Sequence, residues 1–211
     1  MSIFPKEFKE ALSHLPETEK DKLILRLLKK DLNLANRLLF ELVDTKTVED
    51  RRLILQDRII NHVKRITETF YSIAYFNVEV RWLSGDISEH VRITKDKYGD
   101  ASLNLLLLNE VLKQNKNHIL EARPPAKLRK FSIQIIARVF KVLLILNKMD
   151  VDLHLDFKED LMLLGKLISD NKKIMDTAVK NGLDINWLLH AEIPSDLVNI
   201  HKELKANGFL K

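Results

Sequence analysis

The sequence has no cysteine and little glycine or proline. Its 211 residues include five glycines, five prolines and no cysteine. Without cysteine there is no disulfide, thiol nucleophile or thiolate metal site, which is typical of proteins in a reducing compartment. The low glycine and proline content excludes collagen-like and low-complexity chains. We therefore expect a folded, cytoplasmic protein whose chemistry depends on other side chains.

Long apolar runs and a strong excess of one charge are absent as well. The most apolar stretch, 131–149, is interrupted by Lys141 and Lys148, so we expect no membrane-spanning segment. The first residues also lack the apolar core of a signal peptide. There are 35 basic and 30 acidic residues, which are interspersed and leave a net charge of +5. This balance does not indicate nucleic-acid binding, which we keep only as an alternative.

What the sequence does have is apolar residues spaced three and four apart along most of its length. This spacing is typical of amphipathic helices, and it accompanies a hydrophobic fraction of 45% and a charged fraction of 31%. The length is close to that of one domain. We predict an all-α fold, an irregular multi-helix bundle, in a single domain over residues 1–211.

Helix boundaries can be placed from caps and breaks. Thr47 with Asp50 three residues later predicts a capping box, and the apolar stripe that follows extends to residue 95. Such a length is unusual in a globular protein, so we predict two helices with a break near Ser72. Proline predicts helix starts at Pro5 and Pro16. Glycine predicts helix ends at two positions, Gly182 and Gly208.

The second half of the chain contains the predicted central helix, 131–149. Its one narrow polar stripe is formed by Gln134, Arg138 and Lys141, at helical spacing. Before it we expect a turn over 95–99, a buried helix over 103–113 and an extended connector at 123–125. After it, polar and apolar residues alternate over 150–157, which leaves a short extended segment as an alternative there. Helices are predicted at about 156–169, 171–181 and 195–206.

Two clusters of charged residues are candidate sites. The first is a polar site in which Arg138, on an otherwise apolar helix, meets a carboxylate or reaches a polar cavity. Its partner would come from one helical turn around Asp86, where carboxylate and imidazole side chains lie close together. The second is an anion-binding cluster around the prolines at 124 and 125. The polar site comprises Arg81, Asp86, Glu89, His90, Arg92 and Arg138, and the anion-binding cluster comprises Arg123, Lys127, Arg129 and Lys130.

Three stretches of sequence resemble a family of uncharacterised, all-helical bacterial proteins of about 200 residues. They are LILRLLKKDLNLANRLLFELVD, RWLSGDISEHVRITKDKYG and NGLDINWLLHAEIPSD. Some members of that family carry the label deoxyuridine triphosphate nucleotidohydrolase. All-α enzymes of that activity hold Mg²⁺ with the carboxylates of an ExxE and a later ExxD motif. The resemblance therefore implies a metal site whose ligands here would be Glu7, Glu10, Glu41 and Asp44.

No catalytic framework is otherwise evident in the sequence. Walker A, Rossmann glycine, HExxH and GxSxG patterns are all missing. We therefore expect a non-catalytic helical module that binds a protein or an anionic ligand and needs no cofactor. A Mg²⁺-dependent nucleotide pyrophosphatase is the first alternative, with a longer motif separation than such enzymes keep, and a nucleic-acid-binding protein is the second.

Overall fold

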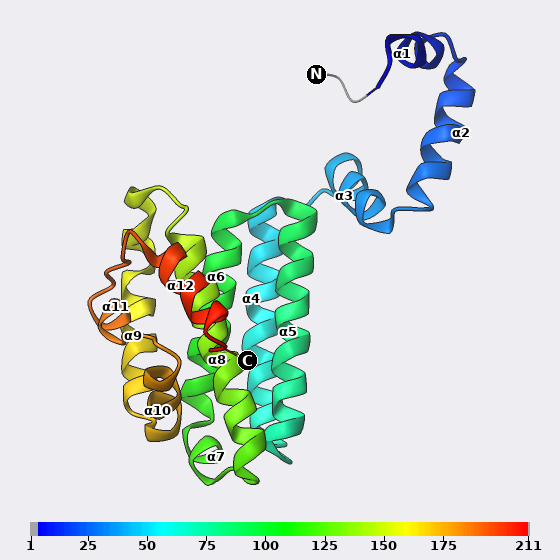
Figure 1. Ribbon diagram of the computed structural model, residues 1–211. Helices are drawn as coiled ribbons and strands as arrows, with labels where there is room; N and C mark the ends of the chain where they lie inside the picture. The colour runs from blue at the N-terminus through cyan, green and yellow to red at the C-terminus, as the bar shows by residue number, and fades with distance from the viewer. Residues whose placement is uncertain (1–3, 211) are drawn as a thin grey trace. The chain divides into compact units, whose positions relative to one another are not determined.

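Helices make up almost all of the regular structure, as the apolar spacing predicts. The computed structural model describes residues 4–210, and within them there are twelve α-helices, one 3-10 helix and no strand (Figure 1). The all-α class and the multi-helix bundle are confirmed. None of the helices in this range has both the length and the apolar character needed to cross a membrane.

Contacts along the chain group it into two units, which we describe separately. The first unit comprises Met1–Thr45 and Arg92–Thr94, and the second comprises Lys46–Val91 and Lys95–Lys211. The single domain that we expected from the length remains a prediction.

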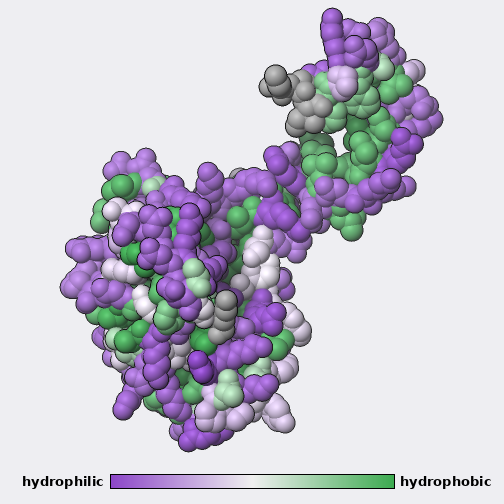
Figure 2. Space-filling model, viewed as in Figure 1, coloured by the Kyte–Doolittle hydropathy of each residue, from purple (hydrophilic) through white to green (hydrophobic). Residues whose placement is uncertain are grey.

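The first unit contains three short amphipathic helices, α1 (Lys6–Ser13), α2 (Glu17–Leu28) and α3 (Leu32–Leu42). Helices α1 and α2 follow prolines, as predicted, and Asp31 caps α3 by accepting hydrogen bonds from two backbone N–H groups. Not one residue of these helices is buried. Their apolar side chains are visible as a green area in Figure 2, and the most exposed include Leu25, Leu32, Leu39 and Leu42.

The second unit begins with two long helices, α4 (Val48–Glu68) and α5 (Ile73–Thr94). The predicted capping box of Thr47 and Asp50 starts α4, and Ser72 caps α5 by accepting a hydrogen bond from the Tyr75 N–H group. The predicted break near Ser72 is therefore confirmed, because the chain leaves the helix after Glu68 and re-enters it through a new cap.

Helix α6 (Lys97–Gln114) is the buried leucine-rich helix, and it contacts α4 and two helices described below, α8 and α9. It is longer than predicted, because the expected turn at 95–99 ends at Asp96. The Asp96 carboxylate caps α6 by accepting from the Gly99 N–H group at 2.7 Å. A Cβ atom at position 99 would lie 2.1 Å from the Asp96 Oδ2 atom, so glycine permits this tight cap.

Helix α7 (Lys116–Glu121) leads to α8 (Pro125–Leu146), which is the predicted central helix. Helix α8 contacts α6 on one side and α10 and α12 on others. The Phe131 ring also lies 5.9 Å from the Phe76 ring of α5. The proline at 125 occupies the first turn of α8, where its missing N–H group leaves no hydrogen bond unmade.

The remaining elements cover one side of α6 and α8 (Figure 1). The extended alternative for 150–157 is wrong: residues 151–157 form a 3-10 helix, which begins where the Asp150 carboxylate accepts from the Asp152 N–H group. Gly182 and Gly208 have φ values of 73° and 83° and follow α10 and α12, as predicted. The elements are η1 (Val151–Phe157), α9 (Lys158–Ser169), α10 (Lys172–Lys180), α11 (Asn186–Leu189) and α12 (Leu197–Ala206).

Candidate functional site

Helix α8 and the two residues that follow it carry basic side chains but no acidic ones. From Pro125 to Lys148 the chain has six basic residues and no acidic one. The apolar residues of α8 are buried in the core, including Phe131, Phe140 and Leu143. The basic residues therefore lie at the boundary between this core and the surface. They are Lys127, Arg129, Lys130, Arg138, Lys141 and Lys148.

Three depressions follow one another along this boundary, and all three include Ala137. Their volumes are about 410, 280 and 460 Å³. We call them together the α8 groove. On one side the groove is lined by α12 and the segment after it, with His201, Lys205 and Leu210. On the other side it is lined by α5, with Arg81 and Ser84. The floor residues come from α8: Ala126, Arg129, Lys130, Ile133, Gln134, Ala137, Arg138, Lys141, Leu144, Ile145 and Lys148.

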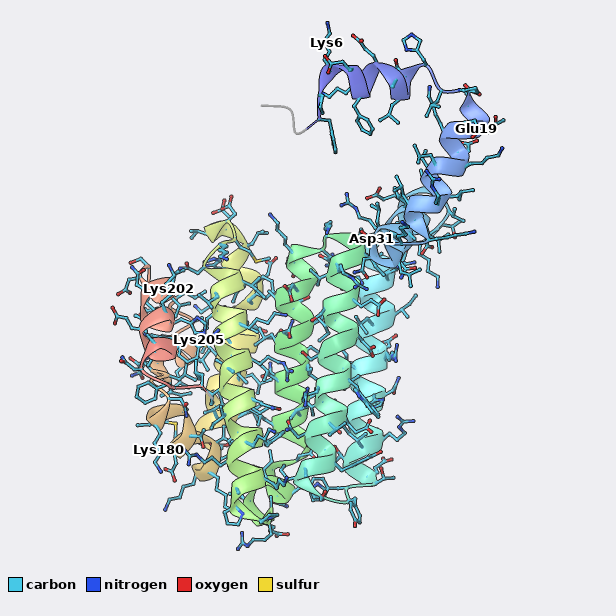
Figure 3. All side chains as sticks on the ribbon, turned by 45° about the vertical axis from the view of Figure 1, so that its right-hand side comes forward. Lys6, Glu19, Asp31, Lys180, Lys202 and Lys205 are labelled. Atoms are coloured by element: carbon cyan, nitrogen blue, oxygen red, sulfur yellow. The ribbon has the colours of Figure 1, made fainter. Side chains whose placement is uncertain are left out.

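The α8 groove combines basic and apolar side chains. No acidic residue lines it among the residues that the structure describes. Lys205 of α12 (Figure 3) adds a further basic side chain to the lining of the groove. The charged side chains that line the groove are therefore all basic, which favours an anionic ligand.

Arg138 is the most constrained of these cations. Burial lowers the pKa of its guanidinium from 12.5 to about 10. Across residues 4–210 no carboxylate forms an ion pair with it, and it lines the middle depression together with Arg81. It therefore occupies a polar cavity, which is one of the two environments that we expected. A partly buried guanidinium without a carboxylate is electrostatically unsatisfied, and an anion in the groove would correct this.

Two neighbours of Arg138 complete the middle depression. The Oε1 atom of Gln134 is buried and has no hydrogen-bond partner within the described part of the chain. The Lys141 ammonium donates to the Asp100 carboxylate at 2.9 Å, and this ion pair holds the lysine side chain in place at the groove. The Gln134 Oε1 atom can therefore accept a hydrogen bond from a ligand, and the Lys141 ammonium beside it is held in a fixed position.

The predicted polar site is only partly assembled. The structure brings Arg81 and Arg138 together in the α8 groove. Asp86 instead pairs with Arg58 of α4 at 3.1 Å, and His90 hydrogen-bonds the Asp96 carboxylate at 3.1 Å. Glu89 is exposed on α5, and Arg92 belongs to the first unit.

The His90 contact belongs to a buried cluster around Asp96. Burial alone would raise the pKa of this carboxyl. Hydrogen bonds from His90, from the Gly99 N–H group and from Arg52, whose Nε lies 2.8 Å from Oδ2, outweigh burial and lower the pKa to about 2. The cluster ties the ends of α4, α5 and α6 together, and it explains structurally why a carboxylate and an imidazole occur near this turn.

The predicted anion-binding cluster is also divided. Arg129 and Lys130 line the α8 groove. Arg123 donates to the carbonyl of Ala122, and Lys127 is exposed on the first turn of α8. Half of the cluster therefore contributes to a larger site that extends further along the helix than the sequence indicated.

The four carboxylates expected for Mg²⁺ all belong to the first unit. Glu10 lies 3.7 Å from the Lys6 ammonium, and Glu41 accepts from Arg37 Nε at 2.7 Å. Over residues 4–210 no group of three or more histidine, aspartate or glutamate side chains is arranged to hold a metal ion.

The sequence did not indicate the residues on the banks of the groove. Lys205 and Leu210 follow 60 or so residues after α8, and nothing in their spacing links them to it. The stripe of Gln134, Arg138 and Lys141 was the available signal, because it predicted which face of α8 would remain polar.

Comparisons with known proteins give no relative. No protein-family model, no curated protein and no solved structure matches this chain.

Proposed function

We propose that the protein is a non-catalytic helical module that binds an acidic, amphipathic segment of a partner protein in the α8 groove. The observation that carries the proposal is the lining of the α8 groove, in which five basic residues of the segment from Pro125 to Lys148 lie among apolar residues and no acidic residue is present within the described part of the chain. Charge complementarity of this kind sets partner choice and speeds association.

The apolar floor favours a protein segment as the ligand. Ile133, Ala137, Leu144 and Ile145 line the groove between the cations. An amphipathic helix can place apolar side chains on such a floor and acidic ones against the cations. Helix α8 has 22 residues and is about 33 Å long, so a partner helix of about six turns could lie along it.

Nucleic acid fits the same groove less well. Proteins that bind single strands stack bases on aromatic rings between their cations. No phenylalanine, tyrosine or tryptophan lines the α8 groove in the part of the chain that the structure describes. The imidazole of His201 is the one ring present. The lack of cysteine agrees with a cytoplasmic setting, where such a module would meet its partner.

Fluorescence anisotropy with a labelled peptide tests the proposal. The peptide has about 20 residues, with leucine at every third or fourth position and glutamate at most others. We expect saturable binding that weakens as salt is raised. The triple variant Arg138→Gln, Lys141→Gln, Lys148→Gln should bind at least about tenfold more weakly. A control triple variant, Lys158→Gln, Lys166→Gln, Lys202→Gln, removes equal charge at exposed positions outside the groove and should bind as the natural chain does.

Two outcomes would contradict the proposal. One is equal loss of binding in both triple variants, which would show that only net charge matters. The other is tighter binding of a labelled single-stranded oligonucleotide than of the peptide, lost in the groove variant. That result would make nucleic acid the ligand of the groove.

A further inference from the structure

A separate cavity lies where α8 meets α10 and the end of the chain. Its volume is about 580 Å³, which is within the range of small-molecule sites. Helices α8 and α10 form two of its walls, and the segment after α12 forms the third with Asn207 and Phe209. The wall is held by a hydrogen bond of 2.9 Å from the Leu210 N–H group to the Asn181 Oδ1 atom.

A buried hydroxyl group without a partner lines this cavity. Ser132 is 1% exposed, and its Oγ atom has no hydrogen-bond partner among residues 4–210. Helical serine and threonine usually donate to the carbonyl four residues earlier. Within residues 4–210 such bonds of 2.8 or 2.9 Å are made by Thr67, Ser88, Ser169 and Thr177, whereas Ser102 of α6 lacks a partner as Ser132 does but lines none of the depressions described above. The Ser132 hydroxyl is thus left for something that enters the cavity.

The charge of the cavity is also incompletely balanced. Arg129 and Lys180 line it, and within residues 4–210 neither forms an ion pair. The Lys173 ammonium donates to the carbonyl of Leu120. Asp176 is the one carboxylate in the lining, so three cations face a single negative charge. An anionic group of the ligand would restore the balance.

Two other polar side chains of the wall already form hydrogen bonds within the protein. The Thr177 hydroxyl donates to the Lys173 carbonyl, and the Asn181 side chain bonds the Thr177 carbonyl and the Leu210 N–H group. Asn207 adds one more polar side chain, and the apolar part of the lining includes Leu128, Ile133 and Phe209. A ligand therefore finds cations and one hydroxyl for its head and an apolar surface for its body.

The geometry points to a binding site for a small phosphate monoester with a compact apolar body, held by Arg129, Lys180 and the Ser132 hydroxyl. Guanidinium and ammonium groups together suit a phosphate, which offers several acceptor oxygens. The site adjoins the α8 groove and shares Arg129 and Ile133 with it, whereas Ser132 and Lys180 line the cavity and not the groove.

Calorimetric titration with phenyl phosphate tests this site. Phenol and inorganic phosphate carry the body and the head alone, and each should bind at least about tenfold more weakly than phenyl phosphate. Ser132→Ala and Lys180→Gln should each weaken phenyl phosphate binding at least about tenfold, since each removes a hydrogen bond to a charged group. The matched controls Ser88→Ala and Lys202→Gln should leave the affinity unchanged.

The melting temperature of the free protein separates binding from packing. Ser132→Ala removes a buried polar group without a partner, so the free variant should melt at the same temperature as the natural chain or higher. Unchanged phenyl phosphate affinity in Ser132→Ala would overturn the inference, and so would the lack of saturable binding at millimolar concentration. Peptide binding in the α8 groove should be the same in both cavity variants, so either site can fail without the other.

Discussion

The imidazole of His62 donates a hydrogen bond from Nε2 to the carboxylate of Glu79, over 2.7 Å. The opposite ring nitrogen, Nδ1, lies 3.0 Å from Arg65, whose guanidinium can only donate. With Nε2 donating to Glu79, Nδ1 is the atom that accepts from Arg65. Glu79 is 3% exposed, and the hydrogen bond satisfies a buried carboxylate between α4 and α5.

His62→Ala should lower the free energy of unfolding by about 1–3 kcal/mol, because it removes one of the donors to the buried Glu79 carboxylate and leaves it with the Tyr75 hydroxyl. The midpoint of urea unfolding measures this change. His190→Ala removes an exposed imidazole and should change stability by less than about 0.5 kcal/mol. Similar losses in the two variants would show that the hydrogen bond to Glu79 has no special role.

The Asp96 cluster predicts sensitivity to acid. The pKa of Asp96 falls from its ordinary 3.8 to about 2 in the folded chain, so the folded state binds fewer protons than the unfolded state between these values. Its contribution to stability is complete above about pH 4 and is lost as the pH falls toward about 2. In Asp96→Asn, stability should therefore depend less on pH in that window than in the natural chain.

Urea unfolding at several pH values measures this dependence, with Asp57→Asn, an exposed position of α4, as the control. Asparagine can still cap α6, so the folded variant remains available for comparison. An acid profile in Asp96→Asn identical to that of the natural chain would refute the role of this carboxylate.

Arg138→Met should stabilise the free protein by about 1 kcal/mol, because it replaces a desolvated guanidinium without a carboxylate by an apolar side chain of similar length. The same substitution should weaken binding of the acidic peptide. Thermal unfolding and anisotropy measure the two effects. Arg129→Met, at an exposed position of the same helix, should leave stability nearly unchanged; a loss of stability in Arg138→Met would mean that the guanidinium is satisfied in the fold.

Phe131→Ala should lower the free energy of unfolding by about 3–5 kcal/mol, since the ring is fully buried in α8 and a cavity would remain. Trp82 has a larger side chain but is 61% exposed on α5. Trp82→Ala should therefore cost less than about 1 kcal/mol. Denaturant titration of both variants tests whether α8 is the centre of the fold.

Hydrogen exchange should differ sharply between the units. Helices α1, α2 and α3 contain no buried residue, so only their local hydrogen bonds slow exchange. The amides of α6, which has ten buried residues, should exchange only through global unfolding. Mass spectrometry of exchanged peptides measures the exchange rates of α1–α3 and of α6. Equal protection of the two would contradict this expectation.

Helix positions were largely predictable because they depend on local signals. The capping box at Thr47, the break at Ser72 and the glycines at 182 and 208 each act on their own backbone. A prediction was less certain where one local pattern fits two kinds of secondary structure. The alternation over 150–157 suits a strand, but an aspartate turn at Asp150 starts a 3-10 helix, in which only Phe157 is buried.

The candidate site was less predictable because it combines distant segments. The polar stripe of α8 identified Arg138, yet its neighbour Arg81 and the opposite bank at Lys205 come from helices whose packing no spacing rule fixes. Asp86 and His90 were grouped with Arg138 from their charges. They pair instead with Arg58 and Asp96, because the contacts of α4 and α6 decide which face of α5 each one meets.

The bond between Asn181 and Leu210 gives the cavity a built-in spectroscopic probe. Leu210 has a φ of 64°, a left-handed conformation that a non-glycine residue adopts at a cost of about 1–3 kcal/mol. Its N–H group is held by the same side chain that faces the cavity. The chemical shift of this single amide should therefore move when phenyl phosphate enters the cavity, and it should stay where it is when phenol or inorganic phosphate is added at the same concentration.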